Sequence, residues 1–144
     1  MFAGSCNAAI ALQSITRPFN VSMDIITSCV ASAQGNLAFG AFTIISAQIS
    51  RTLQIAVKCT RGVPYRVGLG DGSHFAGGTR RMQSAAGNYV TYTLTYQNAP
   101  WDLANTVSGV GAGGNQIFRG AGVVPLQNYR PGVFSDVVQI VVSY

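Results

Sequence analysis

The side chains that most often do chemistry in proteins are scarce in this sequence. Its 144 residues include four Asp, no Glu and one His, at Asp24, Asp71, Asp102, Asp136 and His74. Each acid stands alone in the sequence, and the His has no Cys or His at the spacing that metal ligands require. We therefore expect no metal site, no cofactor and no enzyme activity.

A secreted hydrolase that uses His74 stays open as an alternative, because a fold can assemble a Ser-His-Asp triad from distant residues. The sequence has no Gly-x-Ser-x-Gly elbow, which leaves few catalytic candidates. The Gly-rich run at residues 109–115 lacks the Gly-Lys-Ser/Thr ending of a phosphate-binding loop. It is typical of a flexible hairpin loop instead.

Positive charge is dispersed along the chain. The formal charge of +5 comes from eight Arg and one Lys, with no dense basic run, so we expect no nucleic-acid partner. Only 9% of the residues are charged, against about 25% in typical soluble domains. A secreted chain that is packed against copies of itself needs fewer solubilising charges than a free monomer.

The elements that must position the acidic residues and the His are nearly all strands. The length fits one domain, and alternating apolar residues punctuated by Gly, Asn and Ser indicate an all-β fold. We expect residues 51–60 and 65–69 to form a hairpin, residues 31–35 to turn, and residues 98–115 to be mostly loop anchored by Trp101. Further strand-like runs are 37–40, 89–97, 116–119, 123–125 and 132–144.

An alternating segment near the front of the chain, residues 18–29, predicts a half-buried strand. A period of two places Phe19, Val21, Met23 and Ile25 on one face. If that face enters its own core, the protein is an ordinary sandwich. If it enters the core of a neighbour, the chain is a building block of a polymer.

The three cysteines bear on the cellular compartment in which the protein folds. Cys29 and Cys59 lie at the ends of strand-like runs, and a bridge between them would stabilise the domain by roughly 3.5 kcal/mol. Disulfides imply an oxidising compartment, although two buried free thiols remain the alternative. Cys6 is unassigned, and it lies in residues 1–11, which look like the end of an export signal or a retained tail.

Parts of the sequence resemble the spore coat U family, the pilin domains of archaic chaperone-usher pili. The most specific part is the ending at residues 132–144, where Gly-x-aromatic-x-Asp precedes alternating apolar residues and a terminal Tyr; Phe134 stands where the family usually has Tyr. The other matching segments are Thr27-Ser28-Cys29, Arg81-Met82, Tyr92 to Tyr96, Trp101, Ile117 to Gly120 and Val124 to Gln127.

The resemblance implies an incomplete immunoglobulin-like β-sandwich that is completed by a donor strand from a neighbouring subunit. It divides the chain into a leader remnant or tail at residues 1–11, an extension with the donor strand at 12–27, and a pilin domain at 28–144. The residues that it assigns are the donor side chains Phe19, Val21, Met23 and Ile25, the acceptor-groove side chains Val138, Ile140 and Val142, and the disulfide Cys29–Cys59.

The same resemblance implies a structural subunit that polymerises by donor-strand exchange into an extracellular fimbrium, used for attachment and biofilm formation. Its implied partners are other copies of itself, a periplasmic chaperone and an outer-membrane usher, with secretion through the periplasm to the cell surface. Alternatives are the pilin domain of a tip adhesin, a spore-coat structural protein, or the secreted hydrolase. Self-insertion of residues 18–26, which would complete an ordinary sandwich, also stays open.

Overall fold

The computed structural model describes residues 11–144, and every regular element in that range is a β-strand. The strands are β1 (Cys29–Ala33), β2 (Ile49–Cys59), β3 (Pro64–Leu69), β4 (Arg80–Gln83), β5 (Tyr89–Tyr96), β6 (Ala99–Pro100), β7 (Val107–Val110), β8 (Asn115–Val124) and β9 (Ile140–Ser143). No helix in this range is able to cross a membrane.

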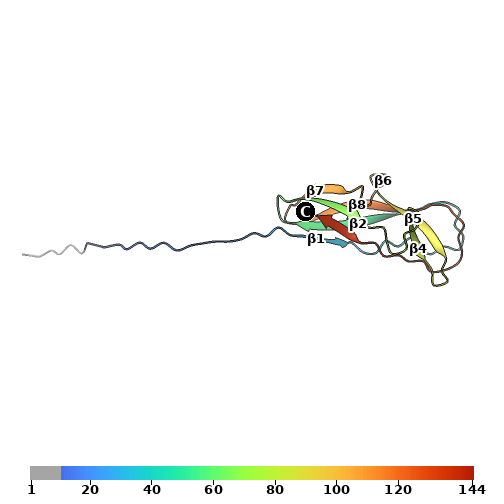
Figure 1. Cartoon of the computed structure of the whole chain (residues 1–144), viewed down its shortest axis with the longest axis horizontal. Helices are drawn as coiled ribbons and strands as arrows, with labels where there is room; N and C mark the ends of the chain where they lie inside the picture. The colour runs from blue at the N-terminus through green and yellow to red at the C-terminus, as the bar shows by residue number, and fades with distance from the viewer. Residues whose placement is uncertain (1–10) are drawn as a thin grey trace, which may run out of the picture.

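Two antiparallel sheets make up the folded body. The larger has the order β1-β2-β8-β5-β4, with β6 beside β5, and the smaller has the order β7-β3-β9. Figure 1 shows the two sheets in one elongated body, from one end of which the N-terminal tail (residues 11–28) extends. The predicted all-β sandwich is confirmed.

The core forms because the alternating faces of both sheets point inward. β3 buries Tyr65, Val67 and Leu69, while its other side chains face outward. Trp101, which the sequence marked as an anchor, is fully buried, and its indole N–H donates to the carbonyl of Val67 over 3.0 Å. The buried apolar side chains that pack together as the core cluster are Ile49, Leu53, Ile55, Val57, Cys59, Tyr65, Val67, Leu69, Val90, Tyr92, Leu94, Trp101 and Val124.

The expected disulfide is present. Cys29 and Cys59 are direct partners in the β1–β2 ladder, with an S–S distance of 2.04 Å and a Cα–Cα distance of 4.1 Å. The bridge therefore joins the first strand to the second at the point where the tail enters the body.

The hairpin prediction for residues 51–60 and 65–69 is wrong. β2 and β3 belong to different sheets, and β3 pairs with β7 and β9 instead. Both strands have an apolar face, so the chain crosses between layers at residues 60–63 and packs the two faces against each other. Tyr65 of β3 meets Phe118 of β8 edge to face, with ring centroids 6.1 Å apart.

Four other expectations also fail, wholly or in part. Residues 31–33 continue β1 rather than turn, because they pair with β2. The expected loop at 98–115 contains β6 and β7. Residues 37–40 form no strand, and of 132–144 only β9 is a strand. Residues 37–40 have strand-like alternation but pair with no strand in the described structure, and residues 132–138 meet β4 only through the bridge between Ser135 and Gln83.

Two further expectations concern the beginning of the chain. The leader remnant at residues 1–11, with Cys6, falls almost wholly on residues 1–10, which lie outside the described residues. Of the predicted strand at 18–29, only Cys29 belongs to a strand in this structure.

Candidate functional site

A groove of about 1150 Å³ opens between the two sheets. Its floor consists of core side chains, chiefly from the larger sheet: Ile49, Leu53, Ile55, Leu69, Val90, Tyr92, Leu94 and Val124. Its two sides are formed by residues 33–45, here called the N-terminal wall, and residues 129–140, here called the C-terminal wall. The floor side chains are at most 8% exposed, whereas Phe42, Val133 and Val137 of the two walls expose apolar surface to solvent.

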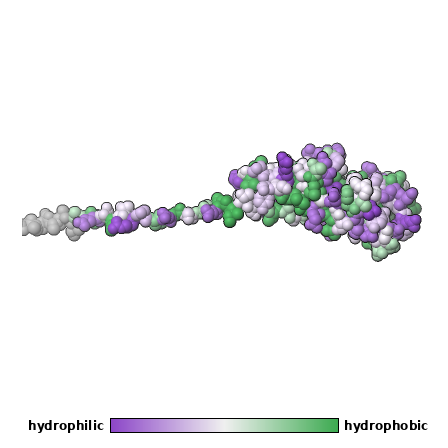
Figure 2. Space-filling model, in the orientation of Figure 1, coloured by the Kyte–Doolittle hydropathy of each residue, from purple (hydrophilic) through white to green (hydrophobic). Residues whose placement is uncertain are grey.

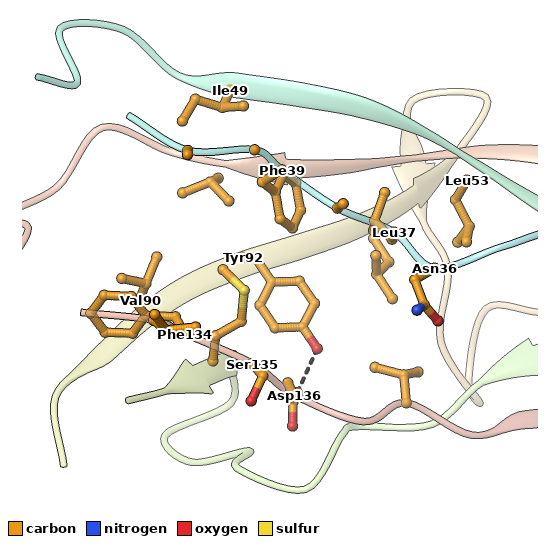
Figure 3. Close-up of a pocket in the computed structure, with 18 of the residues that line it drawn as sticks. Asn36, Leu37, Phe39, Ile49, Leu53, Val90, Tyr92, Phe134, Ser135 and Asp136 are labelled. Atoms are coloured by element: carbon orange, nitrogen blue, oxygen red, sulfur yellow. Dashed lines mark hydrogen bonds between the residues drawn. The ribbon is translucent and has the colours of Figure 1, made fainter. Parts of the chain in front are cut away.

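The N-terminal wall is short of hydrogen-bond partners. Leu37 and Phe39 pack against the core, and Figure 3 shows them above Tyr92. Between residues 35 and 48, however, the described backbone makes no hydrogen bond to other backbone. The wall therefore presents free N–H and C=O groups, as an unpaired sheet edge does.

The C-terminal wall is held to the body from its outer side. Ser135 exchanges two backbone hydrogen bonds with Gln83, of 2.9 and 3.1 Å, and the amide of Gly70 donates to the carbonyl of Gln139. No regular strand lies on the other side of residues 132–138 in the described structure. The wall is thus fixed on one side and unpaired on the side of the groove.

A buried carboxylate strengthens this attachment. Asp136 Oδ1 accepts from the backbone amide of Ser73 at 2.9 Å and lies 3.1 Å from His74 Nδ1. Its Oδ2 accepts from the Tyr92 hydroxyl at 2.5 Å, a bond that Figure 3 shows between the groove floor and its wall. Asp136 thereby connects three separate segments, and the Asp of the C-terminal sequence motif acquires a structural role.

The environment of Tyr92 keeps its hydroxyl protonated. Burial raises the pKa of Tyr92 above its ordinary value, and the hydrogen bond to Asp136 raises that pKa further. The neighbouring charge of Arg80 acts in the opposite direction but more weakly. The protonated phenol is the form that donates to the carboxylate, so the contact persists at neutral pH.

The His74–Asp136 pair has the geometry of two members of a hydrolytic triad, which the sequence did not place together. The neighbouring Ser73, however, directs its hydroxyl to the carbonyl of Val137 at 3.4 Å. Within residues 11–144, no hydroxyl forms a hydrogen bond with the second ring nitrogen of His74, and no cluster of metal-binding side chains occurs. The pair acts here as a structural attachment for the wall.

The donor residues that the sequence suggested are all on the tail and away from the groove. Phe19, Val21, Met23 and Ile25 are 72 to 84% exposed. Figure 2 shows the tail as a separate arm with apolar residues along it. Four large apolar side chains, at every second residue and exposed to solvent, form an apolar surface that no other part of the described structure covers.

The suggested acceptor residues lie at or near the groove. Val138 and Ile140 line it, whereas Val142 packs against the core farther along β9 and does not line it. The sequence reasoning missed the whole N-terminal wall and the role of Asp136. The alternation of Leu37 and Phe39 was a signal for the wall, but it gave no indication of what the segment faces.

The fold and site define a β-sandwich with an open apolar groove and a free apolar arm. A family model described as Spore Coat Protein U domain matches residues 15–141, and the chain belongs to that family. No curated protein sequence matches the chain.

Solved structures agree at the level of the fold. One is a chain of the complex between CsuC and CsuE, the chaperone and tip adhesion subunit of archaic chaperone-usher Csu pili of Acinetobacter baumannii. It matches with a TM-score of 0.63 and 20% identity, over 83% of this chain and 40% of that one. A chaperone–tip adhesin complex of CFA/I fimbriae matches with a TM-score of 0.54 and 8% identity, over 78% and 41%. The chain thus spans about two fifths of the solved chains that it matches.

Proposed function

We propose that this protein is a structural pilus subunit that polymerises by donor-strand exchange. Residues 12–27 form the donor extension and residues 28–144 the pilin domain. Phe19, Val21, Met23 and Ile25 of one copy enter the groove of the next. The observation that carries this proposal is the open groove of about 1150 Å³ in a domain whose own apolar arm lies outside it.

The unpaired backbone of the N-terminal wall supports a strand as the occupant. A strand laid along it would supply ladder partners as well as apolar side chains, which is the mode of β-strand addition. The four donor side chains contribute roughly 6 to 12 kcal/mol on burial, as an upper bound before ordering costs. A joint of that strength opens slowly and suits an extracellular fibre.

The direction of the tail favours a neighbour's groove over its own. β1 runs from Cys29 towards Ala33, where the lining of the groove begins. The residues that precede Cys29 therefore lead away from the groove, and Figure 1 shows them extending from one end of the body. Self-insertion requires the tail to reverse within a few residues, and it is the less favourable arrangement.

An open groove needs protection before assembly, because exposed apolar surface beside an unpaired edge promotes aggregation. We assign that role to a periplasmic chaperone, with an outer-membrane usher as the site of exchange. The fold likeness to chains from chaperone–subunit complexes supports this assignment. The assembled fimbrium then lies at the cell surface and serves attachment and biofilm formation.

The test is a charge placed on the apolar face of the donor. Val21→Asp and Ile25→Asp should each abolish filaments, because a carboxylate cannot enter an apolar groove without a large desolvation cost. The amount of chaperone-bound subunit should stay unchanged, since the groove itself is intact. Electron microscopy of surface material and co-purification with the chaperone measure the two outcomes.

Ser22→Asp is the matched control, because it adds the same charge to the other face of the same segment. It should polymerise. Filaments of normal length from Val21→Asp or Ile25→Asp would rule out the assigned donor face.

A second candidate is the pilin domain of a two-domain tip adhesin. The observation in its favour is that this chain covers only 40% of its match from a complex with a tip adhesion subunit. Immunogold labelling distinguishes the two, since a tip domain labels once per filament and a shaft subunit labels along its length. A spore-coat role, suggested by the family description, predicts labelling of spores instead.

A further inference from the structure

We infer that Thr60 is a positioning residue that fixes the direction in which the donor tail leaves its own domain. This inference rests on the proposed function and adds to it a determinant of subunit orientation. The residues concerned lie at the start of β1, beside the disulfide.

The ladder between β1 and β2 extends one residue beyond the disulfide. The backbone amide of Thr60 donates to the carbonyl of Ser28 at 2.9 Å. After Thr60 the partner strand ends, because the chain turns through Gly62 at a φ of 83°. No backbone of β2 remains to pair with the tail.

The hydroxyl of Thr60 replaces that missing backbone. Its Oγ1 accepts from the amide of Ser28 at 3.0 Å, and lies 3.2 Å from the carbonyl of Ile26 and 3.3 Å from that of Ser28. Its single proton is shared between these two carbonyls. The carbonyl of Ile26 is the most N-terminal group of the described tail that its own domain holds.

The hydrogen bonds of Thr60 to Ile26 and Ser28, here called the clamp, matter because they lie next to the donor side chains. Ile25, the last of them, is separated from the disulfide only by Ile26, Thr27 and Ser28. With Ile26 and Ser28 both bound by Thr60, almost no free backbone separates a donor strand in one groove from the body that owns it. One side-chain hydroxyl thus limits the bend between consecutive subunits.

The test compares Thr60→Val, which keeps the size of the side chain and removes the hydroxyl, with Thr60→Ser, which keeps the hydroxyl. Amide hydrogen exchange at Ser28 is measured on the full chain, in the chaperone complex where it purifies as such. We expect exchange about five-fold faster in Thr60→Val, the effect of one lost hydrogen bond. Thr60→Ser should restore the wild-type rate.

Cryo-electron microscopy of filaments gives the second readout, the spread of the angle between consecutive subunits. The spread should broaden in Thr60→Val and return to the wild-type value in Thr60→Ser. Unchanged Ser28 exchange, or an unchanged angular spread, in Thr60→Val would overturn the inference. If the wild-type chain forms no filaments, the proposed function fails, and the exchange comparison alone decides whether the clamp exists.

Discussion

At the scale of single residues, Asp136 shows how a groove stays shaped without an occupant. Its carboxylate is bonded to Ser73, His74 and Tyr92, which come from a loop and from the groove floor. A buried carboxylate is tolerated only where its oxygens are satisfied, and here both are. These polar contacts therefore hold the C-terminal wall together with the packing of Phe134 and Val138 against the core.

The raised pKa of Tyr92 leads to a prediction about alkaline stability. Because the folded state binds this proton more tightly than the unfolded state does, the stabilisation is complete below about pH 10, the ordinary tyrosine value, and is lost as pH rises above it. The free energy of unfolding of the wild type should therefore stay level up to about pH 10 and fall as the pH rises further. Tyr92→Phe should start lower and fall less steeply.

Urea denaturation at a series of pH values measures this difference. Tyr144→Phe is the control, because it removes a phenol that is mostly exposed. An alkaline loss of stability that is the same in Tyr92→Phe and in the wild type would contradict the assignment.

At the scale of elements, close packing depends on glycines where strands meet other groups. A Cβ added to Gly120 of β8 would come within 2.6 Å of the carbonyl of Thr95 and 2.8 Å of the Trp101 ring. Both neighbours belong to the packed body and have little freedom to move.

Gly120→Ala should therefore destabilise the domain by about 1 to 3 kcal/mol, as overpacking generally does. Gly114→Ala is the matched control, since a Cβ there meets nothing within 4 Å. Guanidinium denaturation midpoints measure both variants. Equal midpoints for the two would show that β8 can shift to make room.

The sequence predicted strands whose alternation is local and strong, and it failed where the identity of the pairing partner decides the structure. Tyr89–Tyr96 was recognised as a strand because its alternation is local and strong, and it pairs on both sides. Residues 37–40 carry similar alternation, yet a strand requires a neighbour as well as a pattern. The wrong hairpin prediction for residues 51–60 and 65–69 has the same origin. Periodicity indicates that a strand has an apolar face, but it does not indicate which surface covers that face.

The candidate site divides in the same way. The donor alternation and the cysteine pair were visible in the sequence, since both are short-range patterns. The contacts of Asp136 were not, because its partners Ser73, His74 and Tyr92 lie 44 to 63 residues away. The N-terminal wall was not visible in the sequence either. Its side chains line a groove only together with those of the C-terminal wall.

At the scale of the whole molecule, the disulfide joins the body to the arm that carries the proposed load. It closes a loop with a sequence separation of 30, and in the chain-entropy model this stabilises the folded state by roughly 3.5 kcal/mol. That is a large part of the stability of a small domain.

The double variant Cys29→Ser, Cys59→Ser should lose stability of this order. Guanidinium denaturation of the chaperone-free chain measures it, with Cys6→Ser as the control for removal of a thiol. A midpoint equal to that of the wild type would mean that the ladder between β1 and β2 holds the first strand without help from the bridge.

The placement of the arm and the groove on one chain would also give the proposed assembly a polarity. In that assembly each copy uses two different surfaces, so the proposed contact between copies is heterologous and does not close into a dimer. A row of such copies has a vacant groove at one end and an unused arm at the other. The two ends therefore need different caps, and a subunit that has a groove but no arm can occupy only one of them.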